Sequence, residues 1–504
     1  MAREIKYQLY IAWDGTTYVD ESSRFIRANG EIRYAPIEES ISTGRGIVDI
    51  MTVTLDNATS RYSPMNTAGA LYTYIQDGKA YHAPVYLNVS IDDGASYFRL
   101  FTGVIKIPKE KAPTMKEGAT VEIDCRSRDE LLMQKRLSTT LANFRTYHDS
   151  GYTESSLMAA WLVQAGFSSG DYTLDAGTQR IDWAWLDDES PLEEMWSLAA
   201  ACGGRFFADN TGEFVYENVG HWLTATRSAT SQETLTESGW QRLTPEYDDK
   251  ELYNVVTVEA SPRVIAAQDI LWEPDETIYI PADSTKKVVA RMRQPAYYIA
   301  DAVYGASSGG GTNLTSDISI AQVNYAQRVE LTITNANVLY GAYLRPLQIL
   351  GQAVGGAPTQ EETRTSAEHG NNSAFFTSVR GGRTRSIRGN VYIQFRDQAG
   401  ALAEMLINRL EWPRLSFKVN GVPGIERYLG DRITIDDSSI MSAPIEVLIV
   451  GINWRLSKDS GYAHDIDAID ASNLYPFATT TPGYFRIGTN ELGAADPQNG
   501  RVFY

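Results

Sequence analysis

The residues with the clearest potential for chemistry lie between 182 and 194, where the sequence reads DWAWLDDESPLEE. Paired carboxylates beside aromatic rings are what a glycoside hydrolase uses, one as the general acid and the other as the base or nucleophile. A helix start explains the same letters, because Ser190 suits the N-cap, Pro191 the first helical position and Glu193 the capping-box position. We prefer the helix, and a carbohydrate-binding or glycan-degrading β protein stays as the alternative, which the 29 tyrosines and 10 tryptophans also suit.

Metal and thiol chemistry find little support in the sequence. The five histidines stand at positions 82, 148, 221, 369 and 464, too dispersed for an HExxH site. In the segment YAHDIDAID, strand alternation places His464 on one face and the carboxylates of Asp465 and Asp467 on the other. Cys125 and Cys202 have no CxxC spacing and are expected to be reduced core thiols. We therefore predict no catalytic residue, no cofactor and no metal.

One basic cluster interrupts an acidic chain of net charge −18. The run RGGRTRSIRGN contains Arg380, Arg383, Arg385 and Arg388. It lacks the interleaved aromatic residues that stack on nucleic-acid bases, so we predict a loop that contacts an acidic neighbouring chain. The overall charge argues against a DNA-binding face, because phosphate affinity needs clustered cations. The phosphate-binding loop GxxxxGK[ST] and the nucleophile elbow GxSxG are also missing, so we predict a protein that is not an enzyme.

The elements that must position these residues are mostly strands. A chain of 504 residues divides into several domains. Short runs rich in β-branched residues occur at 47–55, 85–91, 97–108 and 119–127 and predict an antiparallel first domain. The pattern changes near residue 150, where TESSLMAAWLVQAGF predicts a helix with Thr153 as its N-cap. A second helix follows Ser190, and Asn210-Thr211-Gly212 predicts a hairpin.

Strands return from residue 251 and continue to the basic cluster. The segment GNVYIQFRDQAGALAEMLINRLEW predicts a strand that passes into a helix through Ala401, Met405 and Leu406. Two further strands follow, and the last thirty residues, rich in Pro, Gly and Thr, predict an extended tail. No apolar run is long enough to span a membrane, and the N-terminus shows no export signal.

The stretch from residue 47 ends its apolar strand in Leu-Asp-Asn and continues into Arg-Tyr-Ser-Pro. This pattern resembles the bacteriophage tail hub and tail-tip proteins of tailed phages, most of all the group with long non-contractile tails. The matching positions are Leu55, Asp56, Asn57, Arg61, Tyr62, Ser63, Pro64, Asn66 and, in the next strands, Gly103. The helix and hairpin from 190 to 218 are also similar to that family, and so, in their order and spacing, are the segments 249–260, 328–351, 398–413, 428–437 and 449–456.

The resemblance implies a mainly β fold with an α+β insertion, in which two tube-like β-barrel or sandwich domains carry two decorating domains. The expected units are a first tube-like domain at 1–135, a small mixed α/β domain at 136–244, a second tube-like domain at 245–262 and 390–470, an inserted β domain at 263–389, and a C-terminal tail at 471–504.

The resemblance also implies a structural virion protein of the tail tip, assembled in the bacterial host cytoplasm. Three copies would form a hub that caps and continues the tail tube. The expected partners are the distal tail or tail tube protein, the tape-measure protein, and a tail fibre or tip protein. DNA would pass through the lumen without specific binding, past a bore that we expect to be lined with carboxylates. The hub of a contractile tail or related injection system is the alternative within this class.

Overall fold

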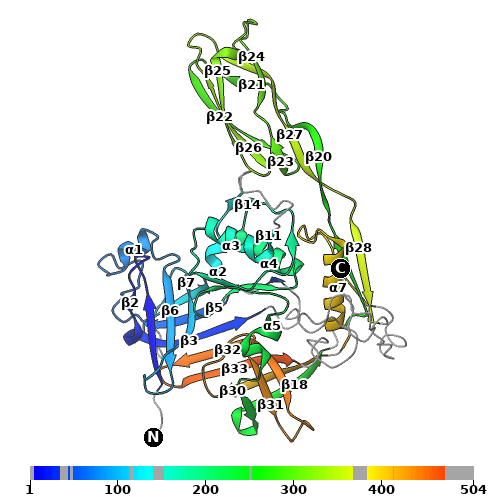
Figure 1. Cartoon of the computed structure of the whole chain (residues 1–504). Helices are drawn as coiled ribbons and strands as arrows, with labels where there is room; N and C mark the ends of the chain where they lie inside the picture. Colours follow the sequence, from blue (N-terminus) through cyan, green and yellow to red (C-terminus); the bar gives the residue numbers. More distant parts are fainter. Residues whose placement is uncertain are drawn as a thin grey trace.

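A computed structural model describes residues 5–34, 44–45, 49–113, 118–139, 152–248, 252–366, 383–412 and 414–471. The fold is mainly β, as the sequence predicts. Figure 1 shows two layers of long strands at the base, a helical region above them, and a slender β domain that projects from the opposite end. In the described ranges no helix is long and apolar enough to cross a membrane.

One large sheet of 14 strands forms the base of the molecule. Its first half contains β1 (Lys6–Ile11), β2 (Val19–Asp20), β3 (Phe25–Arg33), β5 (Ile50–Asp56), β6 (Pro84–Ser90), β7 (Phe98–Ile105), β8 (Lys109–Lys111) and β9 (Thr120–Ser127). Its second half contains β17 (Thr234–Thr236), β18 (Arg242–Asp248), β30 (Arg414–Val422), β31 (Arg432–Asp436), β32 (Ile445–Ser457) and β33 (Gly461–Asp470).

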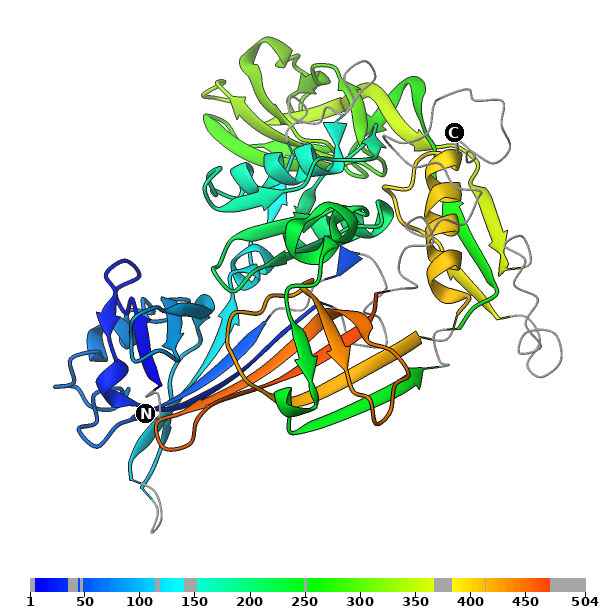
Figure 2. The same cartoon turned by 60° about the horizontal axis from the view of Figure 1, so that its bottom comes forward.

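The two halves meet along an antiparallel seam between β3 and β32. The pairing runs from Arg27 opposite Ser457 to Arg33 opposite Gly451. Figure 2 shows the blue and orange strands lying side by side at this seam. Arg33 Nη2 also donates to Asp467 Oδ2 at 2.8 Å, and a single apolar core contains side chains of both halves. The two halves are therefore one packed body.

Strand alternation gives this sheet one apolar face and one polar face. In β9, Val121, Ile123 and Cys125 are buried while their neighbours are partly exposed. The polar neighbours carry both signs of charge, because Asp124 pairs with Lys109 and Glu122 pairs with Lys111. The polar face is thus charged without being uniformly acidic.

The mixed region above the sheet contains the predicted helices and hairpin. These elements are α2 (Asp129–Met133), α3 (Glu154–Gln164), α4 (Pro191–Ala201), β15 (Arg205–Ala208) and β16 (Phe214–Glu217). At α3, the backbone N–H of Thr153 donates to Ser156 Oγ at 2.9 Å. The capping box predicted at Ser190 is wrong, because its buried hydroxyl has no hydrogen-bond partner among the described residues.

A third unit differs from the sequence-based expectation. Strand β19 (Val255–Ala260) was expected in the second tube-like domain, but it pairs with β28 (Gln360–Thr365) and β29 (Thr384–Ile387), and α7 (Arg396–Leu410) packs against it. The prediction of a strand over 389–395 is also wrong, because these residues form no strand. The prediction of a helix after them is confirmed by α7. Tyr392 and Ile393 leave the extended path because both are buried against the mixed region, where Tyr392 donates to Glu194.

The projecting domain has two small sheets and its own apolar core. Its strands are β20 (Arg263–Trp272), β21 (Ile278–Ile280), β22 (Ser284–Arg291), β23 (Ala296–Ile299), β24 (Val303–Ser307), β25 (Ile318–Asn324), β26 (Arg328–Asn335) and β27 (Ala342–Gly356). Figure 1 shows that β27 runs along most of this domain and leads back to the body of the molecule.

Candidate functional site

The motif turn, residues 55–66, is a chain of short turns that follows β5. Asp56 Oδ1 accepts the N–H of Ala58 at 3.0 Å. Asn57 is fully buried, and its side chain accepts the N–H of Tyr62 at 3.1 Å and donates to Glu110 Oε1 at 3.1 Å. Asn66 donates across the turn to the carbonyl of Ser60 at 3.0 Å. The Asp, Asn and Ser residues of the motif therefore satisfy backbone groups as the chain reverses.

The Arg-Tyr pair of the motif binds a buried carboxylate, Glu21, whose exposed fraction is 2%. Tyr62 Oη donates to Glu21 Oε2 at 2.6 Å, and Arg61 Nη2 donates to Glu21 Oε1 at 3.0 Å. Trp13 Nε1 donates to the same oxygen at 2.9 Å. We call Glu21, Arg61, Tyr62 and Trp13 the glutamate clamp. It fixes the turn to the beginning of the chain and leaves its charges paired.

The electrostatics of the clamp follow from burial and pairing. Burial, reinforced by the hydrogen bond to Glu21, raises the pKa of Tyr62. Burial lowers the pKa of Arg61, but the hydrogen bond to the Glu21 carboxylate and its negative charge raise this pKa more, so the net shift is upward. Both side chains therefore keep their protons throughout the ordinary pH range, and neither is prepared to act as a general base.

Two other motif residues have packing roles. Leu55 is fully buried in the shared core. Gly103 lies where β7 crosses β9, and a Cβ at this position would stand 1.9 Å from the carbonyl oxygen of Arg126. Only glycine allows the two backbones to approach so closely. Ser63 and Pro64 lie within the turn, where the carbonyl of Pro64 accepts a hydrogen bond from Gln76 at 3.3 Å.

The basic cluster is divided by the boundary of the described residues. Arg380 lies outside them, as do His148, His369 and the predicted tail after residue 471. Arg385 belongs to β29 and Arg383 directly precedes it, and both lie over the ring of Tyr253. Arg388 donates to Glu361 at 2.9 Å within the same chain. Contact with a neighbouring chain stays a prediction.

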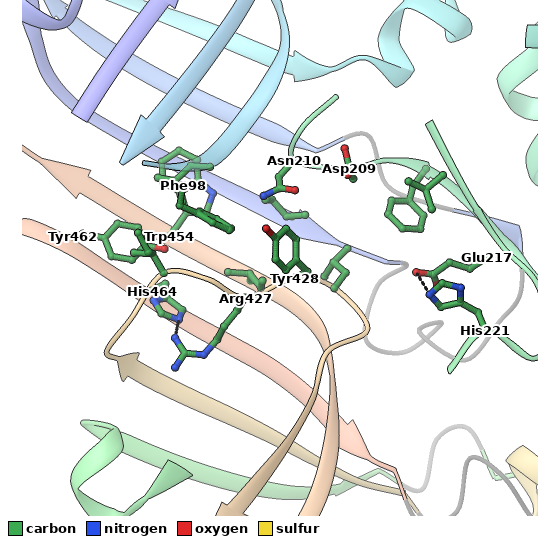
Figure 3. A pocket seen from close by; sticks show the side chains of 17 residues that line it. Phe98, Asp209, Asn210, Glu217, His221, Arg427, Tyr428, Trp454, Tyr462 and His464 are labelled. Carbon is green, nitrogen blue, oxygen red and sulfur yellow. Dashed lines mark hydrogen bonds and ion pairs between the residues drawn. The ribbon is translucent and has the colours of Figure 1, made fainter. Parts of the chain in front are cut away.

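A cavity of about 160 Å³ lies where the two halves of the sheet meet the β15–β16 hairpin. Its lining includes Phe98 and Leu100 of β7, Asn210 of the hairpin, Arg427, Trp454 of β32 and His464 of β33. Figure 3 shows Trp454, Tyr462 and His464 at one end, and Glu217 with His221 at the other. We call this space the junction cavity.

Charged groups at both ends of the junction cavity are held by partners. Arg427 is 8% exposed and donates to Glu233 through Nε and Nη2, and to His464 Nε2 at 2.9 Å. Burial and then the charge of Arg427 lower the pKa of His464 to about 3. At the other end of the cavity, burial lowers the pKa of His221. The hydrogen bond between His221 and Asp175 raises this pKa, and the net shift is upward. His464 is thus a neutral side chain and His221 is the more readily protonated one.

Comparison with known proteins adds names to this architecture. Neither a protein-family model nor a curated protein matches the sequence. A tail protein from Neisseria meningitidis MC58 is similar over 93% of this chain and 98% of its own, at 10% identity and a TM-score of 0.49. For a prophage MuSo2 tail protein from Shewanella oneidensis, the coverages are 94% and 98%, the identity 10% and the TM-score 0.44. A component of the type VI secretion system of E. coli is similar over 96% of this chain and 81% of its own, at 10% identity and a TM-score of 0.40.

These neighbours are tail proteins and a related secretion component. Since these identities are about 10% and these TM-scores lie below 0.5, the likeness assigns no role to any residue of this chain.

Sequence reasoning missed the central residue of the glutamate clamp and the whole junction cavity. Glu21 lies in DESSRF, a segment with no pattern that separates a buried carboxylate from an exposed one. Arg427 and Glu233 lie 194 positions apart, so no local spacing could pair them. The acidic stretch at 182–194 was judged correctly as a helix start, because Trp196 packs in the core and its Nε1 donates to the carbonyl of Phe206 at 3.0 Å.

Two features of the described residues bear on metal-binding and thiol chemistry. Within the described ranges, no group of three or more His, Cys, Asp and Glu side chains is placed to hold a metal ion. Cys125 and Cys202 are free and buried, and burial raises the pKa of both thiols. A buried thiol of raised pKa is a poor nucleophile. The motif residues hold the fold, and the junction cavity lies apart from them, where the two halves of the sheet meet the β15–β16 hairpin.

Proposed function

We propose that this chain is the structural hub at the distal end of a phage tail, where three copies form a ring that caps and continues the tail tube. The observation that carries the proposal is the 14-stranded sheet, in which two halves far apart in sequence are joined through β3 and β32. A chain that contains two such halves supplies two segments of a ring. Three chains would then match a tube of sixfold symmetry.

Closing such a ring requires free strand edges, and the sheet ends in one. β18 pairs with β30 on one side and is the last strand at that end of the sheet order. Tyr247 on β18 is 71% exposed, the largest exposed fraction among the tyrosines of the described residues. We propose that this edge contacts the neighbouring copy, as an unpaired strand edge readily does.

The remaining parts of the proposal concern the channel and the partners. We propose that the polar face of the sheet lines the channel for genome delivery into the host cell. Several of its carboxylates are paired with lysine or arginine side chains: Asp467 with Arg33, Asp124 with Lys109 and Glu122 with Lys111, so the proposed bore carries both signs of charge. The proposed neighbours are the tail tube or distal tail protein, the tape-measure protein, and a fibre or tip protein carried outside.

The mass of the full chain in solution tests the proposal. Light scattering should give three times the monomer mass, and negative-stain images should show a threefold ring. The variant Tyr247→Asp should reduce the trimer fraction at least about tenfold, because it places a charge in the interface core. Tyr298→Asp is the matched control, since Tyr298 is a half-exposed tyrosine on the projecting domain. A chain that stays monomeric with the tail tube protein present, or that cleaves glycans, would overturn the hub.

A further inference from the structure

The projecting domain ends in an apolar loop, residues 336–341, which we call the tip loop. It joins β26 to β27 at the outer end of the domain, where these two strands pair with the start of β25 and with β21. Figure 1 shows β21, β24 and β25 at this end, away from the body of the molecule. Leu339 is 77% exposed and Val338 71%, the largest exposed fractions among the Leu, Val and Ile side chains of the described ranges.

Three tyrosines flank this aliphatic pair. Tyr340 belongs to the tip loop and is 51% exposed. Tyr279 of β21 and Tyr343 of β27 are 44% and 43% exposed, and their ring centroids lie 4.8 Å apart. An aliphatic centre with tyrosines at its margin suits the boundary between hydrocarbon and water, because each ring has an apolar body and a polar hydroxyl.

Two asparagines fix the backbone of the tip loop. Asn335 is fully buried, and its Nδ2 donates to the carbonyls of Tyr340 and Pro281, both at 3.0 Å. Asn337 Oδ1 accepts the N–H of Leu339 at 3.0 Å and that of Tyr340 at 2.8 Å. A segment that enters a bilayer has to satisfy its backbone groups internally, and these bonds do so for part of the loop. The exposed side chains are therefore presented on a fixed backbone.

The size of this apolar surface helps to choose between a protein and a lipid partner. The five exposed side chains, two aliphatic and three aromatic, stand at the end of a narrow domain. A stable protein interface takes roughly 20–30 residues from each partner. A bilayer needs no complementary pocket, and shallow burial of a few aliphatic and aromatic side chains gives reversible binding. The small convex tip thus suits a lipid surface better than a protein pocket.

The charges beside the tip loop indicate which lipid it fits. The N–H of Asp283 donates to the carbonyl of Asn337 at 2.9 Å, and Asp317 Oδ2 accepts a hydrogen bond from Asn337 Nδ2 at 2.8 Å. Lys286 is also near, because its Nζ donates to the carbonyl of Tyr279 at 3.3 Å. Two carboxylates against one lysine leave a negative excess, which anionic headgroups repel. A zwitterionic surface is therefore favoured.

We propose that the tip loop inserts Val338 and Leu339 shallowly into a zwitterionic lipid surface, with the tyrosine rings at the level of the headgroups. The proposal does not depend on the hub function, because a single chain carries the whole loop. Binding by one loop should be weak and reversible, since even a myristoyl chain binds with an association constant of only about 10⁴ M⁻¹. Half-maximal binding is expected above about 0.1 mM lipid.

Flotation of the full-length chain with phosphatidylcholine vesicles tests the proposal. The chain should bind reversibly as the lipid concentration is raised into the millimolar range, and added salt should not weaken this binding. Phosphatidylglycerol vesicles should bind less protein, because they carry the same sign of charge as the chain. Absence of binding to phosphatidylcholine, or stronger binding to phosphatidylglycerol, would overturn the proposal.

A matched pair of variants tests the loop itself. Val338→Asp should lower the partition coefficient on phosphatidylcholine at least about tenfold. Val323→Asp makes the same change at a half-exposed valine on β25, further from the tip, and should leave the coefficient unchanged. Equal effects of the two variants would overturn the proposal. A change in the mass of the chain in Val338→Asp, measured by light scattering, would also overturn it, because the loop would then contact another copy.

A fluorophore measures the insertion directly. Cys125 and Cys202 are buried, so Val338→Cys and Val323→Cys each supply one accessible thiol for an environment-sensitive dye. With phosphatidylcholine vesicles, the emission of the dye at position 338 should rise and shift to the blue, and that of the dye at position 323 should not. An unchanged emission at position 338, or equal changes at both positions, would refute insertion of the tip loop.

Discussion

Each half of the large sheet contains a buried arginine–carboxylate pair, and the two pairs are built in opposite ways. In the glutamate clamp the carboxylate is the more buried partner, with Glu21 2% exposed and the side chain of Arg61 23% exposed. At the junction cavity the arginine is the more buried partner, with the side chain of Arg427 7% exposed and that of Glu233 35% exposed. The first pair is enclosed by Trp13 and Tyr62, whereas the second lies beside a cavity.

The difference shows that the recognisable sequence motif and the junction cavity lie in different parts of the molecule. The other members of the glutamate clamp each lie within 41 positions of Glu21, and both Glu21 oxygens accept hydrogen bonds. The groups around Arg427 come from three distant segments, and neighbouring polar atoms stay unmet. The motif therefore marks a part of the scaffold whose contacts are mostly local, whereas the junction is assembled by tertiary packing of distant segments.

The largest effects on the free energy of unfolding are expected when the carboxylate of each pair, Glu21 or Glu233, is removed. Glu21→Ala should lower the free energy of unfolding by about 4 kcal/mol, because Arg61, Tyr62 and Trp13 lose a common acceptor in a buried site. Glu233→Ala should cost less, about 2–3 kcal/mol: the buried Arg427 loses its charged partner but keeps its hydrogen bonds to Pro423 and His464, and Glu233 itself is partly exposed. Chemical denaturation monitored by tryptophan fluorescence measures both.

A surface pair provides the control for these two variants. Asp77 and Lys79 form an ion pair in which both side chains are more than half exposed. Asp77→Ala should change the free energy of unfolding by less than about 0.5 kcal/mol. Equal losses in Glu21→Ala and Glu233→Ala would show that the two halves do not differ as described.

Alanine substitution of one glycine in each half, Gly103 and Gly451, tests how closely the backbones pack there. In Gly103→Ala the new methyl group would meet a backbone carbonyl 1.9 Å away, and we expect a loss of about 3 kcal/mol. At Gly451 the nearest atom is Asp467 Oδ2 at 3.2 Å, which belongs to a side chain that can move. Gly451→Ala should therefore cost about 1 kcal/mol or less. Thermal unfolding of the two variants gives the ranking, and the reverse order would contradict it.

The pH dependence of the free energy of unfolding reports on His464, which lies in the second half of the sheet. The pKa of His464 is about 3 in the folded chain and about 6.5 when unfolded. As the pH falls from 6.5 to 4.5 the unfolded state takes up the proton, so His464 should remove about 2 kcal/mol of stability over this range. His464→Gln keeps an acceptor for Arg427 and lacks this loss. Unfolding of both proteins at each pH measures it, and parallel pH profiles would contradict the prediction.

The smallest effect is expected on the basic cluster. Arg388 and Glu361 are both about half exposed or more, so Arg388→Ala should change the free energy of unfolding by less than about 0.5 kcal/mol. If this arginine contacts a neighbouring chain, the variant should instead lower the trimer fraction in light scattering. A large loss of monomer stability would show that the pair belongs to the scaffold.

Much of the fold could be predicted from local patterns. Strand alternation and the segment SPLEEMWSLAAACGG identify β9 and α4 because each depends on neighbours within a few positions. The placement of β19 could not be predicted, because its partners begin more than a hundred positions later. The same limit applies to the site: Asn57 and Tyr62 were recognisable within the turn, whereas Glu21 and the junction cavity depend on tertiary packing.

The seam between β3 and β32 also has a consequence for synthesis of the chain. Arg33 leaves the ribosome 434 residues before its partner Asp467. Until then, β3 can pair with β5 on one side and presents an open edge on the other. Such non-local pairing folds slowly, and an open edge favours aggregation. The chain therefore completes its main sheet only at the end of translation, and its yield in a cell should depend on how well that edge is protected before then.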